Sequence, residues 1–266
     1  MRVATAQLTT STDKKANLEK ALEYIAKAKS AGADFVILPE FYMVLATPES
    51  GLLPADAAEP LDGPFVTALA KAAKENEIYV VCGVYESKED DPKRAFNTTV
   101  FIDRSGRIVQ AYHKTHLYDA FKYKESDTII PGDSEYKVVE TEFGKIGLLV
   151  CYELRFPEIA RQLVLQGADV LFIPAGWVKG PLKEDHWQTL LRARAIENTV
   201  FVCGANLVGD IFTGRSITVD PMGFILSSGG EEEALILSDI DLNRIERVRE
   251  KLPSVANRRP ECYISR

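Results

Sequence analysis

The sequence predicts an α/β protein folded as a four-layer α-β-β-α sandwich that is built from two similar halves. Short apolar runs of strand length alternate with longer helical patterns, which is typical of α/β layer folds. Three features of residues 1–110 recur in the same order in residues 144–228. Two sheets that each carry helices on one face can bury their other faces against each other, so the repeat favours the sandwich.

The first recurring feature is Gly-Ala-Asp followed by an apolar strand. Residues 32–34 lead into FVILPE and residues 167–169 lead into VLFIPA, each time after a helical pattern. Next, Glu-Asn at residues 75–76 precedes EIYVVCG, and Glu-Asn at residues 197–198 precedes TVFVCG. Last, NTTVFIDRSGRIV and RSITVDPMGFIL share an Asp, two intervening residues and a Gly, which suits a strand, a tight turn and a second strand.

The remaining segments lie between and after the halves. QAYHKTHLYDAFKYKESDTIIPGDSEY is polar, aromatic and irregular, and functional loops concentrate in such regions. From Asp241 onward the pattern predicts a short charged helix and then an extended arm. No low-complexity linker divides the chain. We therefore expect one domain over residues 1–266, with its core in 1–242 and a C-terminal helix and arm in 243–266.

Composition narrows the class of protein. Lys and Arg total 32 against 39 for Asp and Glu, and the resulting net charge of -7 argues against a nucleic-acid-binding surface. The longest apolar stretches, such as DVLFIPAGWV, are shorter than the roughly 20 residues of a membrane helix, so no membrane association is expected. The beginning RVATAQL lacks the pattern of a secretory signal, and we expect a cytoplasmic protein.

The cysteines and histidines give no support for a metal or a cofactor. The cysteines are far apart, without C-x-x-C or zinc spacing, so neither a disulfide framework nor a metal knuckle is expected. His113 and His116 lack a helical pattern and a nearby third ligand. The glycines match no nucleotide-binding motif. Cys82 and Cys203 occupy equivalent apolar strands of the two halves, where we expect them to pack.

Cys151 stands at the end of the apolar run KIGLLV, directly before what reads as a helix start with Pro157 near its first position. A helix N-terminus favours a thiolate, and we expect this thiol to be exposed at the sheet edge, where hydrolases present nucleophiles. However, a free cysteine is among the most buried residue types and commonly only fills space. This segment by itself favours the second interpretation.

Two further charged residues end predicted strands. Glu40 ends FVILPE, where an unpaired buried charge would be costly, so the carboxylate is exposed or has a partner or a function. Lys114 follows the strand IVQAYHK. Taken in isolation, each is better explained as a solvated surface charge.

Considered together, LPEF around Glu40, HKTHLYD around Lys114 and VCYELRFPE around Cys151 resemble the Glu-Lys-Cys triad of the nitrilase superfamily of carbon-nitrogen hydrolases. The resemblance continues over essentially the whole chain through KESDTIIPGD, HWQTLLRARAIEN, TVDPMG and NRRPECY. These segments are most similar to the amidase branch that includes omega-amidase and deaminated-glutathione amidase. Nitrilases proper typically carry Trp after the nucleophile, whereas Tyr152 stands here.

The resemblance implies an amidase that converts a small linear amide to a carboxylic acid and ammonia through a cysteine thioester. Cys151 would attack the amide carbonyl, and Glu40 would take the thiol proton, pass it to the leaving group and then activate water. Lys114 and the backbone N–H of Tyr152 would hold the oxyanion. Glu125, in YKESDT, matches the family's second glutamate, which orients Lys114 and the substrate; the alternative is a surface acid.

Substrate selection would fall to residues beside this triad, namely Tyr118, Tyr152, Arg155 and Trp177. Arg155 either clamps a substrate carboxylate bidentately or is a structural ion-pair partner, and both readings stay open. Trp177 either lines the pocket or packs.

Several alternatives and partners remain at this point. The same triad serves N-carbamoyl-amino-acid hydrolysis and nitrile hydrolysis. In other classes, the alternatives are a redox-sensing thiol protein and a catalytically silent interaction subunit. The implied partners are a small-molecule amide and further copies of the chain, as a homodimer or larger homo-oligomer that exchanges C-terminal arms.

Overall fold

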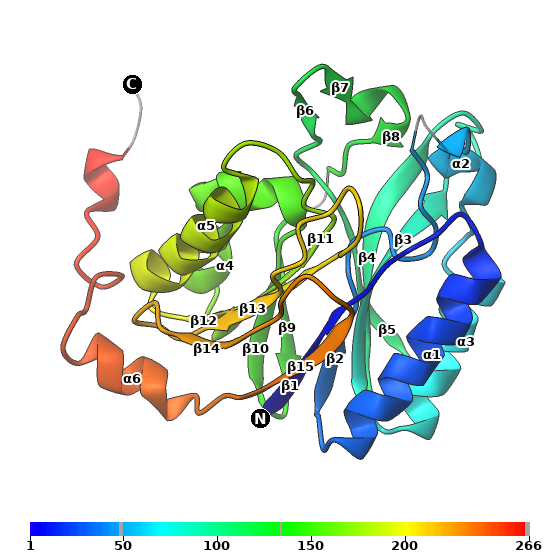
Figure 1. Cartoon of the computed structure of the whole chain (residues 1–266). Helices are drawn as coiled ribbons and strands as arrows, with labels where there is room; N and C mark the ends of the chain where they lie inside the picture. Colours follow the sequence, from blue (N-terminus) through cyan, green and yellow to red (C-terminus); the bar gives the residue numbers. More distant parts are fainter. Residues whose placement is uncertain (48–49, 134, 264–266) are drawn as a thin grey trace.

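The computed structural model describes residues 1–47, 50–133 and 135–263. In this part of the chain two β-sheets face each other and helices cover both outer faces, so the predicted four-layer α-β-β-α sandwich is confirmed (Figure 1). Helices α1 (Lys14–Ser30) and α3 (Pro64–Glu75) cover one sheet. Helices α4 (Pro157–Leu165) and α5 (Lys183–Asn198) cover the other.

The two sheets are assembled in the same order. The first contains, from edge to edge, β15 (Ala234–Asp239), β1 (Arg2–Gln7), β2 (Phe35–Ile37), β3 (Tyr79–Ser87), β4 (Ala95–Ile102) and β5 (Ile108–His113), with β8 (Ile129–Ile130) paired to β4. The second contains, starting from the corresponding edge, β9 (Val138–Thr141), β10 (Gly144–Leu148), β11 (Val170–Ala175), β12 (Phe201–Asn206), β13 (Ile217–Val219) and β14 (Ile225–Ser228). In each sheet three parallel strands are followed by two antiparallel ones, which confirms the two similar halves.

The repeated motifs form equivalent contacts in the two halves. The Asp34 carboxylate accepts a hydrogen bond of 2.8 Å from the backbone N–H of Arg2, and Asp169 accepts one of 2.9 Å from the N–H of Lys145. Each of these aspartates thereby fixes the start of its half's first parallel strand. In the predicted turns, Asp103 and Asp220 each accept two hydrogen bonds from the backbone N–H groups of the turn that follows.

The core follows the two-residue alternation of the strands. Phe35 and Ile37 of β2 pack between the sheets, whereas Val36 faces the layer of α1 and α3. The ring of Phe35 lies 5.5 Å from that of Phe172 on β11, which joins the two inner faces by aromatic contact. These parallel strands therefore read as continuous apolar runs because both of their faces are buried.

Shorter elements complete the chain. Helix α2 (Pro54–Ala57) and the hairpin of β6 (Asp119–Ala120) and β7 (Tyr123–Lys124) lie at the end of the sandwich where the parallel strands finish (Figure 1). Helix α6 (Asn243–Arg249) begins the C-terminal arm, which extends away from the sandwich (Figure 1). In the ranges described, no helix combines the length and apolarity that crossing a membrane requires.

Candidate active site

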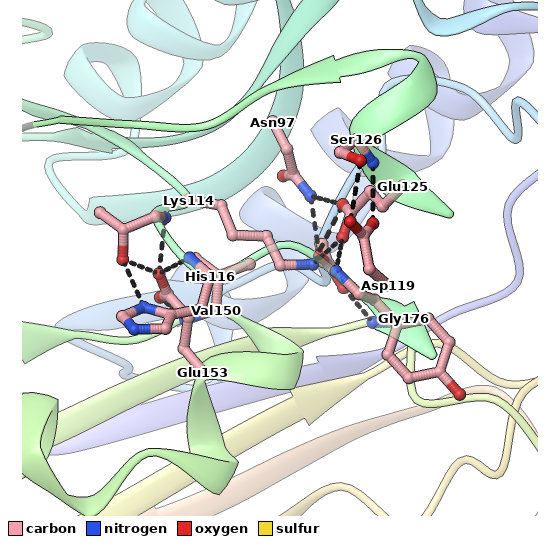
Figure 2. A network of polar contacts seen from close by, with 12 residues as sticks. Asn97, Lys114, His116, Asp119, Glu125, Ser126, Val150, Glu153 and Gly176 are labelled. Atoms are coloured by element: carbon pink, nitrogen blue, oxygen red, sulfur yellow. Dashed lines mark hydrogen bonds and ion pairs between the residues drawn. The ribbon is translucent and has the colours of Figure 1, made fainter. Parts of the chain in front are cut away.

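Glu40, Lys114 and Glu125 come together in a buried cluster. Glu40 follows β2 by three residues and Lys114 directly follows β5, so both lie at the strand ends. Lys114 Nζ is 2.9 Å from Glu40 Oε1. It is also 2.9 Å from Glu125 Oε2 (Figure 2). Each of the three residues is at most 6% exposed. The interpretation of these charges as solvated surface groups does not hold.

Asn97 on β4 belongs to the same cluster and was missed by sequence reasoning. Its Nδ2 donates to Glu40 Oε1 at 2.8 Å and to Glu125 Oε1 at 3.2 Å. The other oxygen of Glu40 accepts a 2.8 Å hydrogen bond from the backbone N–H of Gly176, which directly follows β11. Both sheets thus hold the Glu40 carboxylate in place. The only signal in the sequence was a polar side chain in a strand that is otherwise largely apolar.

Cys151 lies next to this cluster, but not as an exposed thiol at a helix N-terminus, so that prediction is wrong. The residue is 9% exposed and opens a 3-10 helix, Cys151–Arg155. Helix α4 begins at Pro157, which confirms the predicted helix start, but its first N–H groups do not belong to the turn of the nucleophile. The backbone φ of Cys151 is 45°, a left-handed conformation that non-glycine residues rarely adopt and that occurs preferentially at functional sites.

The expected low-pKa thiolate is corrected as well. Burial raises the pKa of the Cys151 thiol well above its ordinary value, the carboxylate of Glu40 raises this pKa further, and the Lys114 ammonium opposes both effects only in part. In the resting protein the thiol is therefore protonated. A nucleophile in this environment needs a base that removes its proton during the attack.

The charge of Lys114 is secured by its partners. Burial by itself lowers the pKa of this ammonium, but the carboxylates of Glu125 and Glu40 outweigh burial and hold the pKa well above its ordinary value. Lys114 therefore remains a cation throughout the physiological range, and it is available to stabilise a negative oxygen next to Cys151.

One cavity of about 380 Å³ is lined by Glu40, Lys114, Glu125 and Cys151. The four residues expected to select substrate, Tyr118, Tyr152, Arg155 and Trp177, line the same cavity. Trp177 does both things that the sequence left open: its ring lines the cavity, and its indole N–H donates to the backbone oxygen of Lys183 at 2.8 Å. The remaining lining is largely aromatic and aliphatic, including Phe41, Tyr85, Phe121, Tyr123, Ile129, Ile211 and Phe212.

A second cation, Lys183, faces this cavity and was missed by sequence reasoning. It is 6% exposed, and its Nζ donates to the Tyr118 hydroxyl at 3.0 Å and lies 4.4 Å from the centre of the Phe121 ring. The Arg155 guanidinium lies 4.7 Å from the ring of Trp177. Among the described residues neither Arg155 nor Lys183 has a carboxylate within 4.0 Å. Two cations in the described lining of the cavity therefore have no carboxylate partner at ion-pair distance.

The other polar residues singled out from the sequence lie outside the cavity. His113 contacts Glu86, and His116 contacts Thr115. Arg194 forms an ion pair with Glu197, at 2.7 Å. Cys82 and Cys203 are buried in β3 and β12. No cluster of three potential metal ligands occurs in the parts of the chain that the structure covers.

Comparisons with known proteins agree with this geometry. The family model described as carbon-nitrogen hydrolase matches residues 2–250. The deaminated glutathione amidase of Escherichia coli O157:H7 is 36% identical, over 97% of this chain and 97% of that protein. An omega-amidase of Mus musculus is 33% identical, over 98% of this chain and 96% of that protein.

Solved structures give the same result. The Caenorhabditis elegans NitFhit protein superposes with a TM-score of 0.91 at 29% identity, over 99% of this chain and 66% of that one. A mutant of the amidase from Nesterenkonia sp. AN1, with the acetamide moiety of fluoroacetamide covalently added at its active-site cysteine, has a TM-score of 0.84 at 25% identity, over 99% of this chain and 95% of that one.

The fold, the cavity with its cysteine and these similarities define a hydrolase that acts on carbon-nitrogen bonds other than peptide bonds. The chain belongs to the carbon-nitrogen hydrolase family.

Proposed function

We propose that this protein is an amidase that converts a small linear amide, itself bearing a carboxylate, to a carboxylic acid and ammonia through a thioester on Cys151. The observation that carries the proposal is the convergence of three buried residues from distant parts of the chain, Glu40, Lys114 and Cys151, on one cavity. The homologous amidases and the covalent adduct on the related Nesterenkonia enzyme support it.

In the first step the neutral thiol of Cys151 attacks the amide carbonyl carbon. As the sulfur–carbon bond forms, Glu40 takes the thiol proton and the carbonyl π electrons move to oxygen. Lys114, together with the backbone N–H of Tyr152, stabilises the resulting oxyanion. The raised pKa of the thiol makes the role of Glu40 necessary, since little thiolate forms without a base.

In the second step the tetrahedral intermediate collapses. The protonated Glu40 gives its proton to the amide nitrogen, the carbon–nitrogen bond breaks, and ammonia leaves a thioester on Cys151. Water then attacks the thioester while Glu40 accepts a proton from it. As the carbon–sulfur bond breaks, Glu40 returns this proton to the sulfur, so the carboxylic acid is released and both the thiol and the carboxylate are regenerated. Gly176 and Asn97 hold Glu40 in one orientation for both steps.

Glu125 has a different role from Glu40 in this scheme. Both of its oxygens contact Lys114 Nζ, at 3.1 and 2.9 Å, and one of them also accepts a hydrogen bond from the backbone N–H of Tyr118. We assign Glu125 to fixing the position and charge of Lys114. When Glu40 becomes protonated, Lys114 has one carboxylate and the oxyanion as its partners, so the number of negative charges around it is conserved.

The carboxylate on the substrate follows from the charges in the cavity. Arg155 and Lys183 are cations without carboxylate partners among the described residues, in a cavity that is otherwise mainly aromatic and aliphatic. An anionic group on the substrate would compensate for them, and Arg155 is able to bind a carboxylate bidentately. Two relatives are named deaminated glutathione amidase and omega-amidase, which supports an amide as the substrate.

Ammonia release from a panel of carboxylate-bearing amides, neutral amides, N-carbamoyl amino acids and nitriles tests the proposal. Carboxylate-bearing amides such as succinamate and glutaramate should be the preferred substrates. Cys151→Ala and Glu40→Gln should each lower kcat by about 1000-fold or more, because each removes a group that takes part in bond formation. The matched controls Cys203→Ala and Glu86→Gln should retain activity.

Specific outcomes would contradict this assignment. Full activity in purified Cys151→Ala would exclude the thioester route. A preference for nitriles or N-carbamoyl amino acids would assign the site to those reactions. No turnover across the panel and no acyl adduct on Cys151 by mass spectrometry would favour a thiol-switch protein or a silent subunit.

We further propose that the enzyme is a cytoplasmic homodimer or larger homo-oligomer. The described cysteines are all free, as expected in a reducing compartment. Apolar side chains such as Leu165, Ile196 and Phe224 are exposed, and the C-terminal arm extends away from the sandwich (Figure 1). A monomer in sedimentation at micromolar concentration, or fractionation of the native protein outside the cytoplasm, would contradict this proposal.

A further inference from the structure

A second polar cluster lies beside the first and centres on Glu153 (Figure 2). This residue stands two positions after Cys151 in the same 3-10 helix, and it is 0% exposed. Among the described residues no cation pairs with its carboxylate. A buried carboxylate without a cation is stable only where several donors satisfy it, so its surroundings must be organised around it.

The two oxygens of Glu153 are satisfied by different segments. Oε1 accepts hydrogen bonds from the Tyr112 hydroxyl at 2.6 Å, the Thr115 backbone N–H at 2.7 Å and the Thr115 hydroxyl at 2.8 Å. A longer hydrogen bond of 3.3 Å comes from the backbone N–H of His116. Oε2 accepts one hydrogen bond of 2.8 Å, from the backbone N–H of Val150.

These donors flank the two groups that meet at the reacting carbon. Thr115 directly follows Lys114, and Val150 directly precedes Cys151. Lys114 comes from the end of β5 in the first sheet, and Cys151 follows β10 in the second. One carboxylate therefore joins the backbone beside the ammonium to the backbone beside the thiol, across the two sheets.

We propose that Glu153 is a positioning residue that sets the distance between Lys114 and Cys151 required for the oxyanion. This role rests on the proposed amidase function, to which it adds a residue that touches neither substrate nor reacting atoms. The tie to Val150 also holds the turn in which Cys151 has its left-handed backbone. Misplacement of reacting groups by about 1 Å costs about 100-fold in rate, so a small shift is sufficient for a large effect.

The two oxygens make Glu153→Gln a selective change. If the amide oxygen takes the Oε1 position, it still accepts the four hydrogen bonds there, and the NH2 group then meets the N–H of Val150. Two donors face each other, and the hydrogen bond beside the nucleophile is lost while size and shape are kept. Tyr112→Phe is the matched control, because it removes one hydrogen bond to Oε1 and leaves all the backbone ties in place.

Steady-state kinetics on a substrate from the panel provides the first readout. Glu153→Gln should lower kcat by about 100-fold and change KM by less than about threefold, since only the transition state is affected. Tyr112→Phe should keep kcat within about threefold of the wild type, although its Tm falls. Glu153→Asp keeps the charge but is one methylene shorter, and it should lower kcat by at least about tenfold.

Reversible binding of succinic semialdehyde provides a readout that does not need turnover. The thiol of Cys151 adds to the aldehyde carbon, and the thiol proton ends on the former carbonyl oxygen, which gives a hemithioacetal that resembles the tetrahedral intermediate. Titration with the ¹³C-labelled aldehyde, followed by NMR, should show about 30- to 100-fold weaker binding in Glu153→Gln. In Tyr112→Phe the affinity should change by less than about threefold.

The outcomes separate this proposal from the amidase assignment. Folded Glu153→Gln and Glu153→Asp proteins that both keep kcat and aldehyde affinity within about threefold of the wild type would overturn the positioning role, even if their Tm is lower. Wild-type protein that hydrolyses no amide in the panel but binds the aldehyde on Cys151, with the expected loss in Glu153→Gln, would support the positioning role and refute the proposed amidase function. Wild-type protein that does neither would overturn both.

Discussion

At the scale of single residues, the protonation of Cys151 decides how the reaction begins. Burial and the nearby Glu40 carboxylate raise the pKa of the thiol, so the resting protein holds a weak nucleophile. The base that we propose, Glu40, is fixed by the N–H of Gly176 and the side chain of Asn97. This arrangement protects the sulfur, because a protonated thiol oxidises and alkylates slowly until a substrate reaches the base.

This view predicts the pH dependence of alkylation by iodoacetamide. The thiolate fraction of Cys151 is small below its raised pKa, so the alkylation rate should keep increasing beyond pH 9. Lys114 lowers the pKa of the thiol, and Lys114→Met should therefore slow alkylation at every pH in this range. Peptide mass spectrometry measures Cys151 separately, and the exposed Cys262 of the same chain serves as the internal reference. A rate plateau for Cys151 near pH 7 would contradict the prediction.

The sequence was sufficient to choose the central residues but not to describe their surroundings. Glu40, Lys114 and Cys151 could be chosen because each ends a predicted strand and stands in a motif that resembles the family. Their burial could not be read in the same way, because it depends on the second sheet and on the hairpin of β6 and β7. For the same reason the sequence suggested an exposed thiolate. Its only signal for Asn97 was a polar side chain in a largely apolar strand, and it gave no sign that Glu153 and Lys183 lie near the site.

At the scale of elements, the close approach of β3 to the turn after β2 positions the proposed base. Gly83 is in β3, and a Cβ at this position would lie 2.4 Å from the backbone nitrogen of Phe41 and 2.6 Å from the Cα of Glu40. Both contacts are with backbone atoms, which have no other place to move in a close-packed layer. The missing side chain of Gly83 therefore defines where Glu40 stands.

Gly83→Ala should consequently displace Glu40. We expect kcat to fall by at least about tenfold, because the base moves relative to Cys151. The Tm should fall as well, because overpacking lowers the free energy of unfolding by about 1–3 kcal/mol. The control is Gly230→Ala, where a Cβ meets no atom within 4 Å and the φ angle is not positive. The two variants are compared by thermal unfolding and by the ammonia assay. Wild-type kcat in Gly83→Ala would show that the turn tolerates the displacement.

At the scale of the whole molecule, the site exists only where the two halves meet. Glu40 and Asn97 come from the first half and Cys151 and Gly176 from the second. One apolar cluster connects Val3 on β1 with Ile245 on α6 and includes the inner faces of both sheets. Fold class and repeat were predictable because both follow from apolar periodicity, whereas the interface between the halves depends on side-chain packing that periodicity does not encode.

A shared core predicts that the protein unfolds as one unit. Residues 1–242 should give a single thermal transition, and loss of ammonia release should coincide with loss of far-UV ellipticity, because neither half retains a complete site or its own covered inner face. Circular dichroism and activity recorded on the same heated samples make the comparison. Two separate transitions, with activity lost in the first, would indicate halves that fold independently.

The hairpin of β6 and β7 links the shape of the cavity to the charged cluster of Glu40, Lys114 and Glu125. Tyr118, at its entrance, lines the cavity and donates its backbone N–H to Glu125, at its exit, which in turn holds Lys114. A substitution that reshapes this hairpin to admit a different molecule therefore also disturbs the charged cluster beneath it. Trp177, Val178 and Lys183 line the same space, and among the described residues their side chains form no hydrogen bond or ion pair with that cluster. Laboratory evolution toward new amides should find its tolerated mutations in the segment from Trp177 to Lys183, and relatives with different preferences should have diverged there first.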